Sequence, residues 1–122
     1  MQQKTIVVAD DDKQIQNLLK TFLESLGYRT VMVDNGWAFM ETVQRIRPDL
    51  ILLDVMMPQL DGLNALDASV FTEAVKDIPI LLITGLAKRE VEEKAKSLGV
   101  REIISKPFDL KVLEAKLLSI LG

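Results

Sequence analysis

The chain has 122 residues, 48% of them hydrophobic, which suits one domain with a buried core. Its formal net charge of -3 argues against direct binding to nucleic acid or to an anionic membrane. Because it contains no cysteine and no histidine, disulfides, thiolate catalysis, cysteine zinc sites and a histidine base are excluded. The apolar runs are too short to span a bilayer and no signal-peptide pattern is present, so we expect a cytoplasmic protein.

The chain alternates short strand-type runs with segments of helical period. Thr5–Ala9 is the first expected strand, and the acidic run Asp10–Asp12 follows it directly. Apolar residues then recur at helical spacing between Ile15 and Leu26. We expect Asp12 to be the N-cap of this first helix and Gly27 to end it.

The central stretch runs from Leu50 to Gly62. Leu50–Leu53 is apolar without alternation, as in a strand buried on both faces of a parallel sheet. Asp54 comes next, and Pro58 and Gly62 delay the following helix until about Leu63. Asp54 should therefore lie at the carboxyl end of a central strand, which is the edge where open α/β sheets bind ligands.

The other elements repeat this alternation of strand and helix. The expected strands are Arg29–Val33, Ile78–Ile83 and Arg101–Ser105. The expected helices are Ala38–Ile46, Leu63–Val75, Arg89–Leu98 and a last helix that is capped by Asp109 and runs to Leu121. Five strands alternating with five helices predict a doubly wound α/β domain with helices on both faces of a five-stranded parallel sheet. The alternation alone leaves the order of the strands open.

Polar residues follow four of the predicted strands. They are Asp10 and Asp11 after the first strand, Asp54 after the third, Thr84 after the fourth and Lys106 after the fifth. Each of these residues alone is commonly an ordinary turn residue or a solvated helix start. Since the carboxyl ends of parallel strands lie on one edge of the sheet, their coincidence there indicates a site.

These residue types suit phosphoryl chemistry. The three carboxylates supply the hard oxygen ligands that Mg²⁺ prefers, and without a cation they would repel one another. Lys106 supplies a positive charge for a phosphoryl oxygen and Thr84 supplies a hydroxyl donor. Since a carboxylate can itself accept a phosphoryl group, these residues predict an aspartyl-phosphate site.

Four segments carry a family resemblance. VVADDD at 7–12, LLDVMMPQLDG at 52–62, LLITG at 81–85 and ISKPF at 104–108 resemble, in order and spacing, the receiver domain of bacterial two-component response regulators. The resemblance covers nearly all of the chain and implies a flavodoxin-like sheet with strand order 2-1-3-4-5. We expect residues 1–122 to form a single receiver domain without an output domain, because the sequence stops after the last predicted helix.

The resemblance also implies a role for each site residue. It implies that Asp54 is the phosphoacceptor, Asp11 a direct Mg²⁺ ligand, Asp10 a ligand acting through water, Met56 a ligand through its backbone carbonyl, Thr84 a switch hydroxyl and Lys106 the phosphate partner. It further implies a cis peptide bond between Lys106 and Pro107. The phosphoryl donor would be a phosphohistidine of a sensor histidine kinase or of a histidine phosphotransfer protein, and the output an unknown downstream protein.

One position departs from the family pattern. Ile103 stands where receiver domains usually have Tyr or Phe as a rotameric switch. A β-branched strand residue cannot copy the swing of an aromatic ring, so we expect the signal to leave the site by another route.

Two other functions are consistent with parts of the sequence. A Mg²⁺-dependent phosphohydrolase could use Asp54 as its nucleophile, but it needs an acid–base residue two positions later, where Met56 stands. A receiver-like scaffold would bind partners without phosphorylation, which fits poorly with intact acidic, Thr and Lys positions. We therefore expect a signalling module rather than an enzyme.

Overall fold

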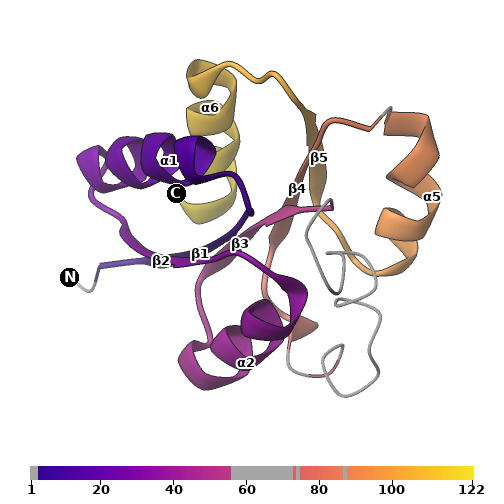
Figure 1. Cartoon of the computed structure of the whole chain (residues 1–122), viewed down its shortest axis with the longest axis horizontal. Coiled ribbons are helices and arrows are strands. Elements are labelled where there is room, and N and C mark those ends of the chain that lie inside the picture. Colours follow the sequence, from indigo (N-terminus) through magenta and orange to yellow (C-terminus); the bar gives the residue numbers. More distant parts are fainter. Residues whose placement is uncertain (1–2, 56–72, 74, 87) are drawn as a thin grey trace.

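A five-stranded parallel sheet forms the centre of the molecule in the computed structural model, which describes residues 3–55, 73, 75–86 and 88–122 (Figure 1). The strands are β1 (Thr5–Ala9), β2 (Arg29–Val33), β3 (Leu50–Asp54), β4 (Ile80–Thr84) and β5 (Glu102–Ser105). Their order is β2-β1-β3-β4-β5, and every neighbouring pair is parallel. The strand order implied by the resemblance is therefore confirmed.

Helices cover both faces of the sheet. They are α1 (Lys13–Ser25), α2 (Gly36–Ile46), α5 (Lys88–Ser97) and α6 (Leu110–Leu121). Helices α1 and α6 pack on one face, and α2 and α5 pack on the other (Figure 1). This arrangement confirms the doubly wound α/β class.

The interior strands carry the core because they are covered on both faces. All five residues of β3 and all five residues of β4 are buried. Successive side chains alternate between two apolar layers: Leu52 packs in the layer under α1 and α6, and Leu53 packs in the layer under α2 and α5. The edge strands β2 and β5 are partly exposed, so the predicted central position of Leu50–Leu53 is confirmed.

Local signals place the helix ends. The Asp12 carboxylate accepts the N–H groups of Gln14 and Ile15, as expected of the N-cap of α1, and Gly27 follows α1 with a positive φ of 95°. Asp109 caps α6, also as predicted. Helix α2 begins at Gly36 rather than Ala38, because the Asn35 side chain accepts the Ala38 N–H at 2.9 Å and starts the helix earlier.

One predicted helix cannot be compared with the described residues, and one predicted strand begins later than expected. The described part of the chain contains four helices rather than five, and the expected helix Leu63–Val75 lies almost wholly outside the described residues. Strand β4 begins at Ile80 rather than Ile78, because Pro79 has no N–H to give to a sheet ladder and the Ile78 N–H bonds back to the Val75 carbonyl at 2.9 Å. Within the described ranges, no helix is both long and apolar enough to cross a membrane.

Candidate functional site

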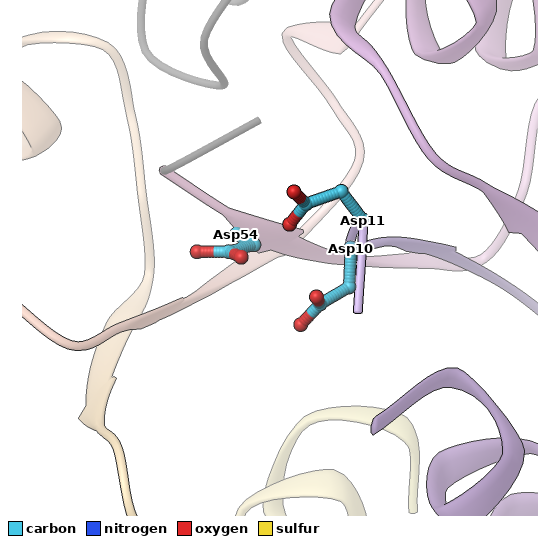
Figure 2. A group of neighbouring side chains, drawn as sticks. All are labelled: Asp10, Asp11 and Asp54. Atoms are coloured by element: carbon cyan, nitrogen blue, oxygen red, sulfur yellow. The ribbon is translucent and has the colours of Figure 1, made fainter. Parts of the chain in front are cut away.

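Three carboxylates meet at the carboxyl edge of the sheet, where β1 and β3 end side by side (Figure 2). The register pairs Ala9 with Leu53, so Asp10 and Asp54 are the next residues along two neighbouring strands. Asp10, Asp11 and Asp54 each offer a carboxylate oxygen, and these atoms lie within 4.8 Å of one another. Asp10 and Asp54 are only 2% and 4% exposed, whereas Asp11 is exposed. The structure thus brings together three of the predicted site residues.

Lys106 lies between two of the carboxylates. Its Nζ is 2.9 Å from Oδ2 of Asp10 and 3.2 Å from Oδ2 of Asp54. Burial of the ammonium lowers its pKa, but the hydrogen bond to Asp10 and the charges of Asp54 and Asp10 outweigh burial, so the pKa of Lys106 is raised above 10.5. The cluster therefore contains an internal cation that neutralises one of its three negative charges.

The backbone around Lys106 is tied to β4. The Lys106 N–H donates to the Thr84 carbonyl at 2.8 Å, which fixes the chain after β5 beside the end of β4. The peptide bond between Lys106 and Pro107 is cis, as the resemblance implied. With its backbone bonded to the Thr84 carbonyl, Lys106 extends its side chain to Asp54 across the end of β4, the intervening strand.

Thr84 is the last residue of β4 and is fully buried. The register pairs Ile83 with Asp54, so Thr84 lies one residue beyond that pair on the strand next to β3. Its hydroxyl oxygen accepts the N–H of Leu86 at 3.0 Å. In this conformation the hydroxyl oxygen is engaged by the loop that follows β4.

Comparison with known proteins identifies the family. The response regulator receiver domain family matches residues 6–118, which is nearly the whole chain. The chain belongs to the response regulator receiver domain family. Receiver domains are the signalling domains of two-component systems, and those of response regulators interact with histidine kinases.

Individual relatives support this assignment. The chain is 34% identical over 121 residues to the probable transcriptional regulator ycf27 of Porphyridium aerugineum, covering 99% of the chain and 49% of the relative. Its fold is similar to the chemotaxis protein CheY4 of Vibrio cholerae, with a TM-score of 0.89, 25% identity and coverage of 98% and 99% of the two chains. It is also similar to the receiver domain of the sensor histidine kinase PA1611 of Pseudomonas aeruginosa, with a TM-score of 0.86, 28% identity and 99% coverage of both chains. The chain spans about half the length of ycf27 and nearly all of the two receiver structures.

The donor set of this receiver domain fits a hard divalent cation. Receiver domains bind Mg²⁺ at an acidic pocket, and the crystal structure of the PA1611 receiver domain has a magnesium ion coordinated in the active-site cleft of that protein. Here the cluster offers carboxylate oxygens from two adjacent strand ends, two of them on buried residues, and the sequence has no histidine or cysteine to supply a nitrogen or thiolate ligand. This set suits Mg²⁺, which takes a few carboxylates and fills its other positions with water and phosphate oxygens. The expected backbone ligand Met56 lies outside the described residues.

One further residue at this edge of the receiver domain, Gln16, was not predicted from the sequence. Gln16 of α1 is only 7% exposed and its side-chain amide contacts the backbone of Asp10. The signal was present, because Gln16 shares its helical spacing with Leu19 and Leu23, the two buried leucines of α1. A polar residue within a buried stripe needs a hydrogen-bond partner, and here the partner is the chain segment that carries the carboxylates.

Proposed function

We propose that this receiver domain accepts a phosphoryl group on Asp54 in a Mg²⁺-dependent reaction. The donor is a phosphohistidine of a sensor histidine kinase or of a histidine phosphotransfer protein. The phosphorylated form then binds a downstream protein through an altered surface. The observation that carries this proposal is the cluster of Asp10, Asp11 and Asp54 at one strand edge with the Lys106 ammonium within reach of Asp54.

The phosphoryl transfer involves two reacting groups, the Asp54 carboxylate and the phosphohistidine of the donor. A carboxylate oxygen of Asp54 attacks phosphorus, the P–N bond to the donor imidazole breaks, and the electron pair of that bond returns to the imidazole nitrogen. The product is an acyl phosphate on Asp54 and a free histidine on the donor protein. A carboxylate is a competent nucleophile for such a step, because positioning and charge neutralisation supply most of the catalysis.

The other residues have supporting roles in this proposal. Asp10, Asp11 and Asp54 would hold Mg²⁺ with the backbone carbonyl of Met56, and the bound ion would neutralise charge on the phosphoryl oxygens. Lys106 would pair with the phosphoryl group, because its ammonium already lies 3.2 Å from the Asp54 carboxylate. The Thr84 hydroxyl would give up its contact with Leu86 and donate to a phosphoryl oxygen.

Intact-mass measurement tests the proposal directly. The parent protein, mixed with Mg²⁺ and a small acyl phosphate such as acetyl phosphate, should gain the mass of one phosphoryl group, and EDTA should prevent the gain. Asp54→Asn and Asp54→Ala should gain nothing, because neither side chain offers a nucleophilic carboxylate. Asp12→Asn is the matched control: Asp12 lies at the same edge but caps α1, Asn caps a helix as well as Asp does, and labelling should persist.

The same experiment separates the other two functions. Undiminished labelling of Asp54→Asn would remove Asp54 from the role of phosphoacceptor. Steady release of inorganic phosphate without an adduct would favour a phosphohydrolase. A parent protein that neither gains mass nor releases phosphate would favour a scaffold that acts without phosphorylation.

A further inference from the structure

Gln16 connects helix α1 to the segment that carries two of the site carboxylates. Its Nε2 atom donates to the carbonyl oxygen of Asp10, and the same nitrogen lies 3.4 Å from the carbonyl oxygen of Val33. Because both neighbours are carbonyl oxygens, only the nitrogen of the amide can face them. The side chain therefore joins the ends of β1 and β2, which are neighbouring strands in the sheet.

Asp10 is fixed through each of its polar groups. Its N–H donates to the Val33 carbonyl at 3.0 Å, which extends the pairing of β1 with β2 by one residue. Its Oδ1 accepts the Asp12 N–H at 2.9 Å and its Oδ2 accepts Lys106 Nζ at 2.9 Å. The contact from Gln16 holds the remaining group, the carbonyl. Because all four of its polar groups are hydrogen-bonded, Asp10 has little freedom to reorient.

The Asp10 carbonyl belongs to the peptide plane that joins Asp10 to Asp11. A hydrogen bond to that oxygen fixes the plane and the Asp11 N and Cα atoms in it. The Asp12 N–H, bonded to Asp10 Oδ1, restrains the next peptide, so the two contacts together set the direction in which the Asp11 Cα–Cβ bond leaves the backbone. Among the described residues, no hydrogen bond or ion pair holds the exposed Asp11 carboxylate itself. The direction of that carboxylate therefore depends on its backbone.

We propose that Gln16 is a positioning residue of the carboxylate cluster. By holding the Asp10–Asp11 peptide plane against the end of β2, it aims the Asp10 and Asp11 carboxylates at Asp54. The metal part of this inference rests on the proposed function, because it takes the cluster to be a Mg²⁺ site. Residues that hold metal ligands in place through hydrogen bonds, without touching the metal, commonly weaken metal binding by about tenfold or more when they are removed.

Gln16→Met is the informative variant, because Met has nearly the length of Gln but has no N–H to donate. Thr42→Val is the matched control, since Thr42 is also 7% exposed and polar but lies on α2, on the opposite face of the sheet from α1. Both variants remove one buried polar group from a helix. Gln16→Asn keeps the amide but shortens its reach by one methylene, and it should show the same effects if Gln16→Met does not fold.

Isothermal titration with MgCl₂ is the first measurement. We expect Gln16→Met to bind Mg²⁺ with a Kd on the order of tenfold higher than the parent, while Thr42→Val keeps the parent Kd. Equal Mg²⁺ affinity in Gln16→Met and the parent, together with only a lower melting temperature, would overturn the inference, since Gln16 would then contribute to packing alone.

Amide hydrogen exchange in EDTA is the second measurement and needs no metal. In Gln16→Met the N–H groups of Asp10 and Asp12 should exchange about tenfold faster, whereas core amides such as that of Leu52 should keep their parent rates. Unchanged exchange at Asp10 and Asp12 would contradict a positioning role. A parent that binds no Mg²⁺ would overturn the proposed function instead, and faster local exchange would still support Gln16 as the residue that holds this peptide.

Discussion

Removing the charge of Asp11 should stabilise the metal-free protein. Asp11, Asp10 and Asp54 have carboxylate oxygens within 4.8 Å of one another, while the unfolded chain can separate them. At that distance each pair of unit charges repels by about 3.5 kcal/mol at an effective dielectric constant of 20, and by about 0.9 kcal/mol at 80. Asp11 faces two such carboxylates, and the Lys106 ammonium, which pairs with both of them, offsets about one of their two charges, so roughly one unbalanced repulsion remains.

The exposure of Asp11 sets the expected size of the effect. Its carboxylate is in contact with water, so the value at the higher dielectric constant applies, and Asp11→Asn should gain about 1 kcal/mol. For a chain of 122 residues this gain corresponds to an increase in melting temperature of roughly 3–5 °C. Such a gain would fit the general observation that charged sites are kept for function at a cost in stability.

Magnesium should reverse the ranking of parent and variant. A ligand that binds only the folded state stabilises it by RT ln(1 + [L]/Kd), which is about 2.7 kcal/mol at a hundredfold excess over Kd. The parent should gain this amount at such a concentration, and Asp11→Asn, which has lost a ligand, should gain well under half of it. Thermal unfolding followed by circular dichroism, in EDTA and then in a MgCl₂ series, measures both effects.

Asp12→Asn serves as the control for the Mg²⁺ effect, because Asp12 caps α1 and lies outside the cluster. It should keep the full Mg²⁺ stabilisation. Asp54→Asn should gain less stability in EDTA than Asp11→Asn, since Asp54 pairs with Lys106 and the substitution weakens that favourable contact. If Asp11→Asn melts below the parent in EDTA and Mg²⁺ raises both melting temperatures equally, the three carboxylates do not form one metal site.

Two further predictions concern Lys106. In EDTA, Lys106→Met should be less stable than the parent by up to a few kcal/mol and should melt at a lower temperature, because Asp10 and Asp54 would be left buried without their counter-charge. It should also gain more stability from Mg²⁺ than the parent does. An unchanged melting temperature in EDTA would contradict the pairing. Alkaline pH should weaken the same contact. Burial lowers the pKa of Lys106, but Asp10 and Asp54 raise it by more, so the stability that its charge contributes is fully present below pH 10.5 and is lost as the pH rises through the higher pKa of the folded state. The melting temperature of the parent should therefore fall above pH 10.5 relative to that of Lys106→Met.

The sequence alone determined the framework of this receiver domain. An apolar run without alternation is typical of a strand buried on both faces, which predicted an interior position for Leu50–Leu53 in a parallel sheet. Side chains that cap a helix act within three residues, so Asp12 and Asp109 could be identified locally. The carboxyl ends of parallel strands share one edge, so the alternation of strands and helices placed Asp10, Asp11 and Asp54 on the same edge, and the strand order implied by the resemblance made their strands neighbours.

The tertiary structure decided the contacts within that edge. Lys106 follows Asp10 by 96 residues and Asp54 by 52. Its contacts with both carboxylates depend on how β4 and β5 pair beside β3 in the sheet. The direction of the Thr84 hydroxyl depends on the loop that supplies the Leu86 N–H. The partner of Gln16 depends on the angle at which α1 crosses the sheet. Such contacts arise from packing between distant segments and from side-chain rotamers, and neither of these is encoded in the local pattern of the sequence.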